Sequence, residues 1–450
     1  MRNTKSIGDK ILSNRICGKV CMWLVIFTSF YYPIGAFFIL TLKVPSTPVN
    51  IALKAGAAGA ALYLIALALI NKRKTLTIPT PVWFILIFWI VYSVRLLYDM
   101  NIADVHFGGK PDSLVYGYAF GNILLPLVAM VFWYKFIDIK EFAHLTFKFF
   151  FVANLLVFII LLQQNGGFNL DLFVSRAAAM SEKEDIKELV LNPITIGFYG
   201  GLLSITSLYF MLVIKKTRIW IYVPLFLFGL LMLVLGASRG PFISTIATLL
   251  IVIFYRFRIS YSKLITFFKM LLIIIVTGVV VSKSMGDNVS LENFQMYNRL
   301  SRLLEDRQND RKETRDLAWA SAWQDFLDSP LVGKQFVGTF DQFYPHNIVL
   351  EIPMATGLLG SFFFLGFFIP LLIKIFKSYL NRDHEYFFLS IVFAPIFIGR
   401  LFSGCLYMSI DLWLVMTIMV AINVQRKAKI IHVRESKLVS QKSLAYNLQA

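Results

Sequence analysis

Charged residues are scarce in this chain of 450 residues. Only 16% of the residues are Asp, Glu, Lys or Arg, whereas 58% are hydrophobic, and the mean hydropathy is +0.69. Soluble domains are closer to half apolar and a quarter charged. The composition therefore excludes both a water-soluble globule and a disordered chain, and it indicates a protein that crosses the membrane several times.

Cysteines are scarce too. The three of them, Cys17, Cys21 and Cys405, have no metal-binding spacing and provide no disulfide framework. We therefore expect no metal site and no cofactor.

Long apolar runs, in contrast, fill most of the chain. Most are near the ~20 residues that a helix needs to cross the hydrocarbon core. They predict an all-α polytopic membrane protein with about twelve transmembrane helices. The first run follows a basic stretch without a clear cleavage site, so we expect an uncleaved anchor. The runs lie at 20–42, 49–70, 82–98, 118–134, 145–162, 191–214, 219–236, 241–255, 264–282, 348–373, 387–402 and 406–424.

Lysine and arginine predict the orientation of these spans. With a cytoplasmic N-terminus, the inner segments hold 25 basic and 6 acidic residues, and the outer segments hold 14 basic and 18 acidic residues. Cytoplasmic loops carry such an excess of Lys and Arg. Both termini are therefore expected inside. The net charge of +18 then reflects topology and contact with anionic lipids, and no nucleic-acid partner is expected.

The expected organisation has four parts. Helices 1–9 occupy 1–282, a long outer loop 283–347 separates spans 9 and 10, helices 10–12 occupy 348–424, and a basic cytoplasmic tail follows at 425–450. A second outer segment, at about 163–190, is expected to be a loop that ends in charged residues.

One helix is expected within the long outer loop, from Arg315 to Asp328. Arg315, Trp319, Trp323 and Phe326 lie on one face of it. Two interpretations are open. The aromatic face lies at the lipid–water interface near a lipid-borne substrate, or the tryptophans only anchor the loop.

Two histidines, His106 and His346, are expected on the outer side, and His346 is the stronger candidate for chemistry. It lies in Tyr344-Pro345-His346-Asn347, where the long loop re-enters the membrane. A neutral imidazole there can accept a proton from a substrate hydroxyl. The alternative is a histidine that merely caps the span.

Arginines are the second class of candidate. Arg239 lies in a tight outer turn, Gly236-Ala237-Ser238-Arg239-Gly240-Pro241. A guanidinium is suited to phosphate oxygens, although an arginine at this depth can also snorkel to the headgroups. Arg315 shares its loop with seven other basic residues, so alone it is weak support for a site.

Other ionisable groups lie in or near the spans. Arg400 and Asp411 are expected to form a structural ion pair. Glu351 follows Asn347 by one turn, and a carboxylate there is costly unless it is paired. It is expected to orient His346 or to contact a substrate hydroxyl. Lys54 and Arg95 are expected to snorkel.

Together these residues resemble a known family. The motifs are Ser238-Arg239-Gly240, Arg315-x-x-x-Trp319, Pro330-Leu331-x-Gly333, His346-Asn347-x-x-Leu350 and Gly357-Leu358-x-Gly360. This pattern, over about 238–360, resembles the O-antigen ligase and oligosaccharide repeat-unit polymerase family of bacterial envelopes. Gln335 departs from it, because the family often has a second glycine there.

The resemblance implies a glycosyltransferase at the outer face of the bacterial cytoplasmic membrane. Its donor is a glycan on a polyprenyl (undecaprenyl) diphosphate, and its acceptor is a sugar hydroxyl on lipid A–core or on another repeat unit. His346, Arg239 and Arg315 would be catalytic, and Asn347, Glu351 and Trp319 would bind substrate, without a metal and with inversion at the anomeric carbon. A flippase for lipid-linked sugars and a non-catalytic envelope scaffold remain as alternatives.

Overall fold

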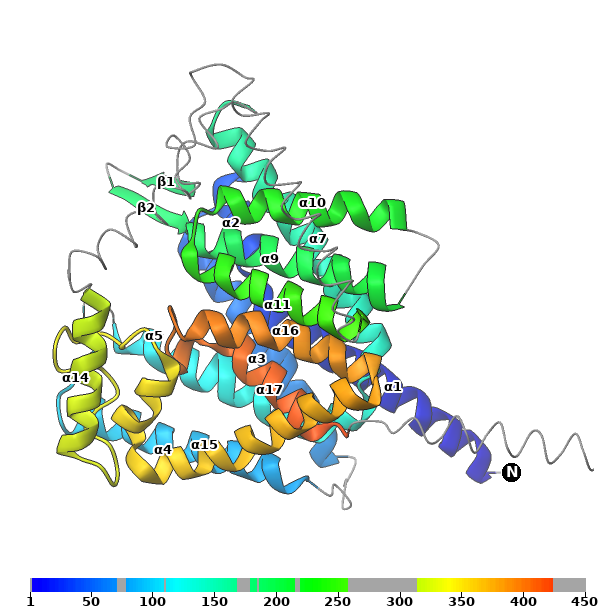
Figure 1. The fold of residues 1–450 in the computed structure, drawn as a ribbon. Helices are drawn as coiled ribbons and strands as arrows, with labels where there is room; N and C mark the ends of the chain where they lie inside the picture. The colour runs from blue at the N-terminus through cyan, green and yellow to red at the C-terminus, as the bar shows by residue number, and fades with distance from the viewer. Residues whose placement is uncertain are drawn as a thin grey trace, which may run out of the picture.

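The computed structural model describes residues 2–70, 78–108, 111–167, 179–183, 186–214, 219–257 and 314–423. Over these residues the chain is helical apart from one pair of strands (Figure 1). The expected span 264–282, most of the long outer loop and the basic tail lie outside the described residues. The helices are α1 Arg2–Phe30, α2 Tyr32–Leu40, α3 Ser46–Ile70, α4 Thr80–Asn101, α5 Asp112–Tyr116, the π-helix η1 Gly117–Leu124, α6 Leu125–Trp133, η2 Tyr134–Phe136, α7 Ile139–Gln164, α9 Pro193–Tyr209, η3 Phe210–Ile214, α10 Ile219–Leu235, α11 Arg239–Phe257, α14 Thr314–Asp328, α15 Ile348–Asn381, α16 His384–Arg400, η5 Leu406–Met408 and α17 Ile410–Ala421.

The expectation of an all-α polytopic membrane protein is confirmed, but the number of spans is confirmed only in part. Seven described helices are long and apolar enough to cross a membrane, or eight if a bent pair counts as one span. Two further apolar helices, α10 and α17, have only 17 and 12 residues. Hydropathy alone could not separate a short buried helix such as α17 from a true span.

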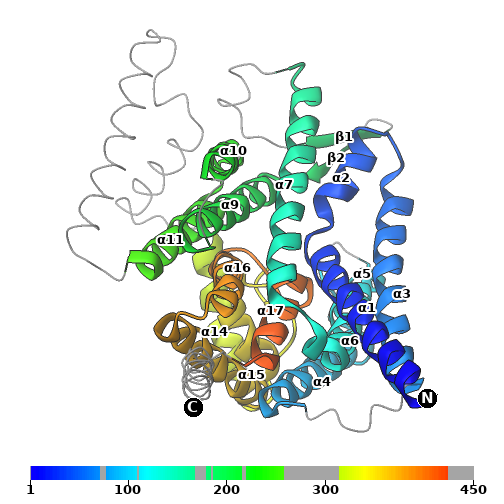
Figure 2. The same ribbon diagram turned by 90° about the vertical axis from the view of Figure 1, so that its right-hand side faces the viewer.

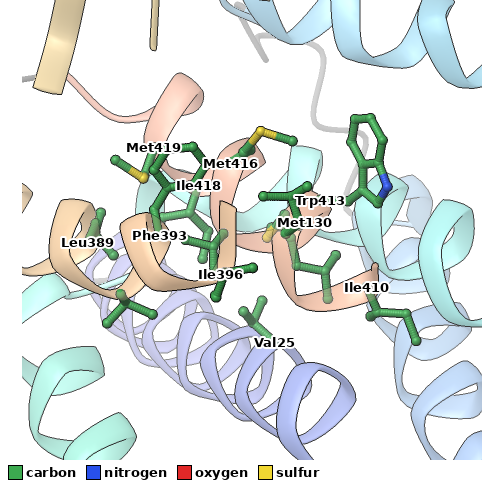
Figure 3. Close-up of a cluster of buried hydrophobic side chains, with 14 of the residues drawn as sticks. Val25, Met130, Leu389, Phe393, Ile396, Ile410, Trp413, Met416, Ile418 and Met419 are labelled. Carbon is green, nitrogen blue, oxygen red and sulfur yellow. The ribbon is translucent and has the colours of Figure 1, made fainter. Parts of the chain in front are cut away.

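α17 is short because it is the centre of the bundle. All twelve of its residues are buried, and α1, α4, α6, α15 and α16 pack around it. Figure 3 shows Trp413, Met416 and Met419 of α17 in one apolar cluster with Phe393 of α16 and Val25 of α1. A helix that touches no lipid has no need of the full membrane thickness. Its packing fixes the ends of α16 and α17 relative to α1.

The first apolar run is broken in two. α1 and α2 meet at Tyr31 with a bend of 61°. Pro33 follows the break. A proline has no backbone N–H to donate, and its ring collides with the carbonyl four residues earlier, here that of Ser29. The chain therefore turns sharply in the middle of what the hydropathy predicts as one span.

α7 runs between two groups of helices. α9, α10 and α11 pack beside one another on one side, and α1 and α2 contact it from the other (Figures 1 and 2). α9 is mostly buried, and it begins after Asn192, whose side chain accepts hydrogen bonds from the backbone N–H and hydroxyl of Thr195. This cap fixes the start of α9 at one end of the bundle.

The outer segment 163–190, expected to be a loop, holds a strand pair instead. β1 (Ala179–Lys183) and β2 (Ile186–Leu191) pair antiparallel, and β2 contacts α2. The charged residues at 182–188 hide the alternation that normally predicts a strand.

Candidate active site

Three arginines from three different helices line one cavity of about 1170 Å³. They are Arg239 at the start of α11, Arg315 in the first turn of α14 and Arg400 at the end of α16. The break between α1 and α2, η1 and the starts of α9 and α17 complete the wall. Asp411 is the one acidic side chain among the described lining residues. The cavity is therefore positively charged, and such a wall attracts an anionic ligand.

Several helices begin at this cavity as well. The first residues of α11 and α17, together with the cap of α9, belong to its wall. The start of a helix carries a partial positive charge and unpaired backbone N–H groups. These dipoles add to the charge of the arginines, so the site is suited to phosphate oxygens.

Arg239 is held by a tight turn between α10 and α11. A Cβ at Gly236 would lie 2.5 Å from the backbone nitrogen of Gly197 in α9, so only glycine fits there. Ala237 has a positive φ of 39°, and Ser238 is buried. The close approach of the turn to α9 places Arg239 at the cavity, where it is partly exposed.

Arg315 lies on an exposed turn of α14, and the expected helix from Arg315 to Asp328 is confirmed. The buried face of α14 consists of Ala318, Ala322 and Asp325. Asp325 is 1% exposed, and its carboxylate accepts hydrogen bonds from Lys334 Nζ at 3.0 Å and from Thr339 N and Oγ1 at 3.0 and 2.7 Å. These bonds tie α14 to the loop that follows it and so fix the position of Arg315.

The expected ion pair between Arg400 and Asp411 is confirmed. Arg400 Nη2 donates to the two oxygens of Asp411 at 2.9 and 2.8 Å. Both residues also line the cavity, which the sequence did not indicate. Arg400 Nε is buried without a hydrogen-bond partner in the described part of the chain. Pairing alone therefore does not use all of the donors of this guanidinium.

His346 lies between the outer loop and α15 with a positive φ of 57°. Such a conformation is uncommon for a residue with a side chain and is often found at functional sites. The ring packs edge-on against Tyr344 with centroids 4.6 Å apart, and Nδ1 is buried without a described partner. Burial and the positive charge of Arg315 lower the pKa of His346, while Asp341 opposes them. His346 is therefore neutral at pH 7 and able to accept a proton.

His346 is not among the described residues that line the cavity. It is connected to the cavity through Arg315, whose charge acts on the imidazole. The cavity thus brings Arg239 and Arg315 together, and His346 is close enough to Arg315 for its charge to act on the imidazole.

Two of the three expected substrate-binding residues, Asn347 and Glu351, have structural hydrogen bonds. The Asn347 side chain accepts the Val349 N–H at 3.0 Å as the N-cap of α15. Glu351 is fully buried, and both carboxylate oxygens accept the Leu406 N–H at 3.0 Å. The Trp319 indole N–H is buried without a partner in the part of the chain described. None of the three is among the described lining residues, and their substrate contacts stay predictions.

Two of the glycine motifs pack against each other beside the site. α15 is interrupted at Gly357, where φ is 60° and ψ is −158°. The Leu358 N–H donates to the Pro330 carbonyl at 2.8 Å, and the Leu359 N–H donates to the Leu331 carbonyl at 3.1 Å. The loop that follows α14 therefore docks onto the break in α15.

No side chain fits at this contact. A Cβ at Gly333 would lie 2.4 Å from the Ala355 carbonyl carbon, and a Cβ at Gly357 would lie 2.4 Å from that of Leu331. Both glycines also have positive φ. The close backbone approach explains why the sequence has glycine at both places.

Arg95 binds this docked loop. The expectation that it snorkels to the headgroups is therefore wrong. Its guanidinium donates to the carbonyls of Val332, Gly333 and Ala355 and to Asp99. Asp99 is 1% exposed and accepts the Phe336 N–H at 2.8 Å. Gln335, where the motif departs from the family pattern, precedes this bond, and its amide nitrogen is buried without a described partner.

The comparison with known families agrees with this geometry. Residues 224–365 match the model of the O-antigen ligase family. No curated protein matches the chain. The matched region includes Arg239, Arg315, His346 and the two docked glycine motifs, and it excludes the first 223 residues. The resemblance deduced from the motifs is thus confirmed, and over residues 224–365 this chain matches the O-antigen ligase domain.

Proposed function

We propose that this protein is a membrane glycosyltransferase of the bacterial envelope. It moves a glycan from a polyprenyl (undecaprenyl) diphosphate to a sugar hydroxyl, as an O-antigen ligase or as a polymerase of O-antigen or capsule repeat units. The acceptor is lipid A–core in the first case and another lipid-linked glycan in the second.

One observation carries this proposal. Arg239 and Arg315 lie 76 positions apart in the sequence, yet they line the same cavity, and the charge of Arg315 acts on His346. The donor carries a diphosphate, and its negative charge grows as it leaves. Guanidinium groups positioned where charge develops stabilise the transition state.

The chemistry follows from these positions. The acceptor hydroxyl oxygen attacks the anomeric carbon from the face opposite the diphosphate, and a new glycosidic bond forms as the bond to the phosphate oxygen breaks. His346 takes the hydroxyl proton. Undecaprenyl diphosphate leaves with the electron pair, held by Arg239 and Arg315. The anomeric carbon is inverted, and the arginines take the role that a divalent metal ion has in other transferases.

The proposal includes a topology. Twelve spans with both termini cytoplasmic would place the cavity at the outer face, because most of its wall comes from the span ends that the Lys and Arg distribution assigns to the outside. The break between α1 and α2, which also lines the cavity, would lie deeper, within the first span. Spans 1–9 within 1–282, the outer loop 283–347, spans 10–12 within 348–424 and the tail 425–450 form its four parts. Membrane lipid surrounds the spans and the donor's polyprenyl tail.

A reconstitution experiment separates this function from its alternatives. The purified full chain in liposomes receives undecaprenyl-diphosphate-linked glycan and acceptor, without nucleotide or ion gradient. We expect a new glycosidic bond and release of undecaprenyl diphosphate. A flippase would move the donor across the bilayer without forming product, and a scaffold would do neither, so either of those results would disprove the proposal.

A deletion strain distinguishes the two acceptors. Loss of a ligase leaves lipid A–core without its polysaccharide, whereas loss of a polymerase leaves single repeat units in place of long chains. Gel analysis of the polysaccharide from the deletion strain and from its parent strain shows which of the two occurs.

A further inference from the structure

The part of the wall that comes from α1, α2, η1 and α9 has a different chemistry. The described lining residues from α1, α2, η1 and α9 carry no charge. Most of them have a hydroxyl group, and several have an aromatic ring. We define the hydroxyl wall as Thr28, Ser29, Tyr31, Tyr32, Tyr118 and Thr195.

Two hydroxyls of this wall lack hydrogen bonds. Thr28 Oγ1 and Ser29 Oγ are buried without a partner in the described structure, and Thr28 is only 2% exposed. Burying a hydroxyl that makes no hydrogen bond is unfavourable. Both residues belong to the cavity wall, so a ligand could supply the missing bonds once rotation about χ1 turns the hydroxyls into the cavity.

The break between α1 and α2 places these groups at the cavity. Thr28 and Ser29 end α1, and Tyr31 and Tyr32 lie at the bend before Pro33. At 3.6 residues per turn these four positions fall within an arc of about 160°, on one side of a helix. All four line the same cavity.

Hydroxyls and tyrosine rings together match the chemistry of a sugar. A sugar ring has hydroxyls that donate and accept hydrogen bonds, and it has an apolar C–H face that packs on an aromatic ring. Tyrosine offers both an apolar face and a polar end. We infer that the hydroxyl wall binds the first sugar of the donor, the one attached to the diphosphate.

This inference rests on the proposed function. If the arginines hold the diphosphate, the first sugar is one glycosyl oxygen away and must lie in the same cavity. The acceptor approaches from the side of His346, which is not among the described lining residues. The hydroxyl wall therefore contacts the donor sugar.

The hydroxyl wall and the arginines also fall in different parts of the chain. Arg239, Arg315 and His346 lie within the region 224–365 that matches the O-antigen ligase model, and all six residues of the hydroxyl wall lie before it. The diphosphate chemistry thus belongs to the matched region, and recognition of the sugar belongs to the N-terminal part.

Lipid binding to the full chain in nanodiscs tests the inference. The probes are undecaprenyl diphosphate without a sugar and the same lipid carrying glucose, galactose, N-acetylglucosamine or N-acetylgalactosamine. We expect the unmodified protein to bind at least one glycosylated lipid more tightly than the bare lipid. The double variant Thr28→Val and Ser29→Ala should weaken that binding about tenfold, or about 1.4 kcal/mol, and leave bare-lipid binding within about twofold.

Thr146 in α7 provides a matched control. Its Oγ1 is also buried without a described partner, but Thr146 is not among the described lining residues. Thr146→Val should change neither affinity. Since the double variant removes only unsatisfied hydroxyls, its thermal unfolding temperature should be unchanged or higher.

Each contrary result has a distinct meaning. Equal affinity of the unmodified protein for bare and glycosylated lipids would overturn the inference. So would a double variant that binds the glycosylated lipid as tightly as the unmodified protein does, or one that loses affinity for both lipids to the same extent. Failure of the unmodified protein to bind even the bare lipid would instead refute the proposed function, and the inference with it.

Discussion

Arg239 occupies an electrostatically unfavourable place for a cation. It is the first residue of α11, where the helix itself carries partial positive charge. An anion in the cavity, as we propose, would interact favourably with both the guanidinium and the helix dipole.

Arg239→Lys keeps the charge but loses the two-pronged contact with phosphate oxygens. We expect the rate of glycan transfer to fall by more than about tenfold, because losing a hydrogen bond to a charged group costs about 1.5–3 kcal/mol. Membrane insertion should be normal. Arg256→Lys in the last turn of the same helix should keep full activity. Near-normal transfer by Arg239→Lys would favour snorkelling to the headgroups.

His346→Ala should reduce turnover by about 10²–10⁴-fold, the contribution of positioned proton transfer, and preserve donor binding. The pH profile offers a second readout. Burial and Arg315 lower the pKa of His346, and only the neutral ring accepts a proton. Transfer should therefore persist at neutral pH and fall only below the ordinary histidine value of about 6.5.

Asp341 changes that profile in a known direction. Its charge raises the pKa of His346, so Asp341→Asn should move the acidic fall in activity to lower pH. The asparagine oxygen can still accept the Phe343 N–H that Asp341 binds. A shift to higher pH, or weak donor binding by His346→Ala with normal turnover, would contradict the role of general base.

Residue types and spacing were enough to select Arg239, Arg315 and His346 as candidates. They could not select Arg400, which looked like half of a structural ion pair. Its place in the cavity depends on the packing of α16 against α17, which local sequence does not encode. For the same reason Glu351 looked available to substrate, although its carboxylate holds Leu406.

At the scale of elements, α14 was predictable and its packing was not. The aromatic face suggested how α14 would lie, but the buried face is the one with Ala318, Ala322 and Asp325, and Asp325 bonds to the loop that follows α14. Trp323 is 51% exposed. The docking of the loop onto α15 could not be predicted either, since a glycine motif does not indicate which backbone segment packs against it.

Gly333→Ala tests this docking. At position 333 φ is 77°, and a Cβ would lie 2.4 Å from the Ala355 carbonyl carbon. Alanine there should therefore destabilise the contact by at least the ~1–2 kcal/mol that a residue with a side chain costs in the left-handed conformation. We expect the loop amides to lose their protection from hydrogen exchange, and we expect the variant to lose most of its transfer activity. Gly56→Ala is the control, because its Cβ meets nothing within 4 Å. Unchanged protection in Gly333→Ala would show that the contact is not required.

At the scale of the whole molecule, the cavity wall combines residues at predicted outer span ends with the break between α1 and α2, which lies in the middle of the first predicted span. Its place at the outer face stays a prediction from the Lys and Arg excess. The number of spans was harder to predict, because a wholly buried helix such as α17 is as apolar as one that faces lipid, and because Pro33 divides the first run.

Cysteine labelling tests the orientation. Cys17, Cys21 and Cys405 are all buried, so background labelling should be low. Gln324→Cys on the exposed surface of α14 should react with an impermeant maleimide in intact cells. Lys140→Cys, at a side chain that is 75% exposed, should react only after the inner membrane is permeabilised. The reverse pattern would invert the topology and place the cavity inside.

The central claim is that the arginine-lined cavity holds the diphosphate of a lipid-linked glycan. The most direct measurement is a structure of the full chain in a lipid nanodisc with undecaprenyl diphosphate. The expected result is diphosphate density in the cavity within hydrogen-bond distance of Arg239 and Arg315. Diphosphate density on another surface, with the cavity empty, would contradict the account.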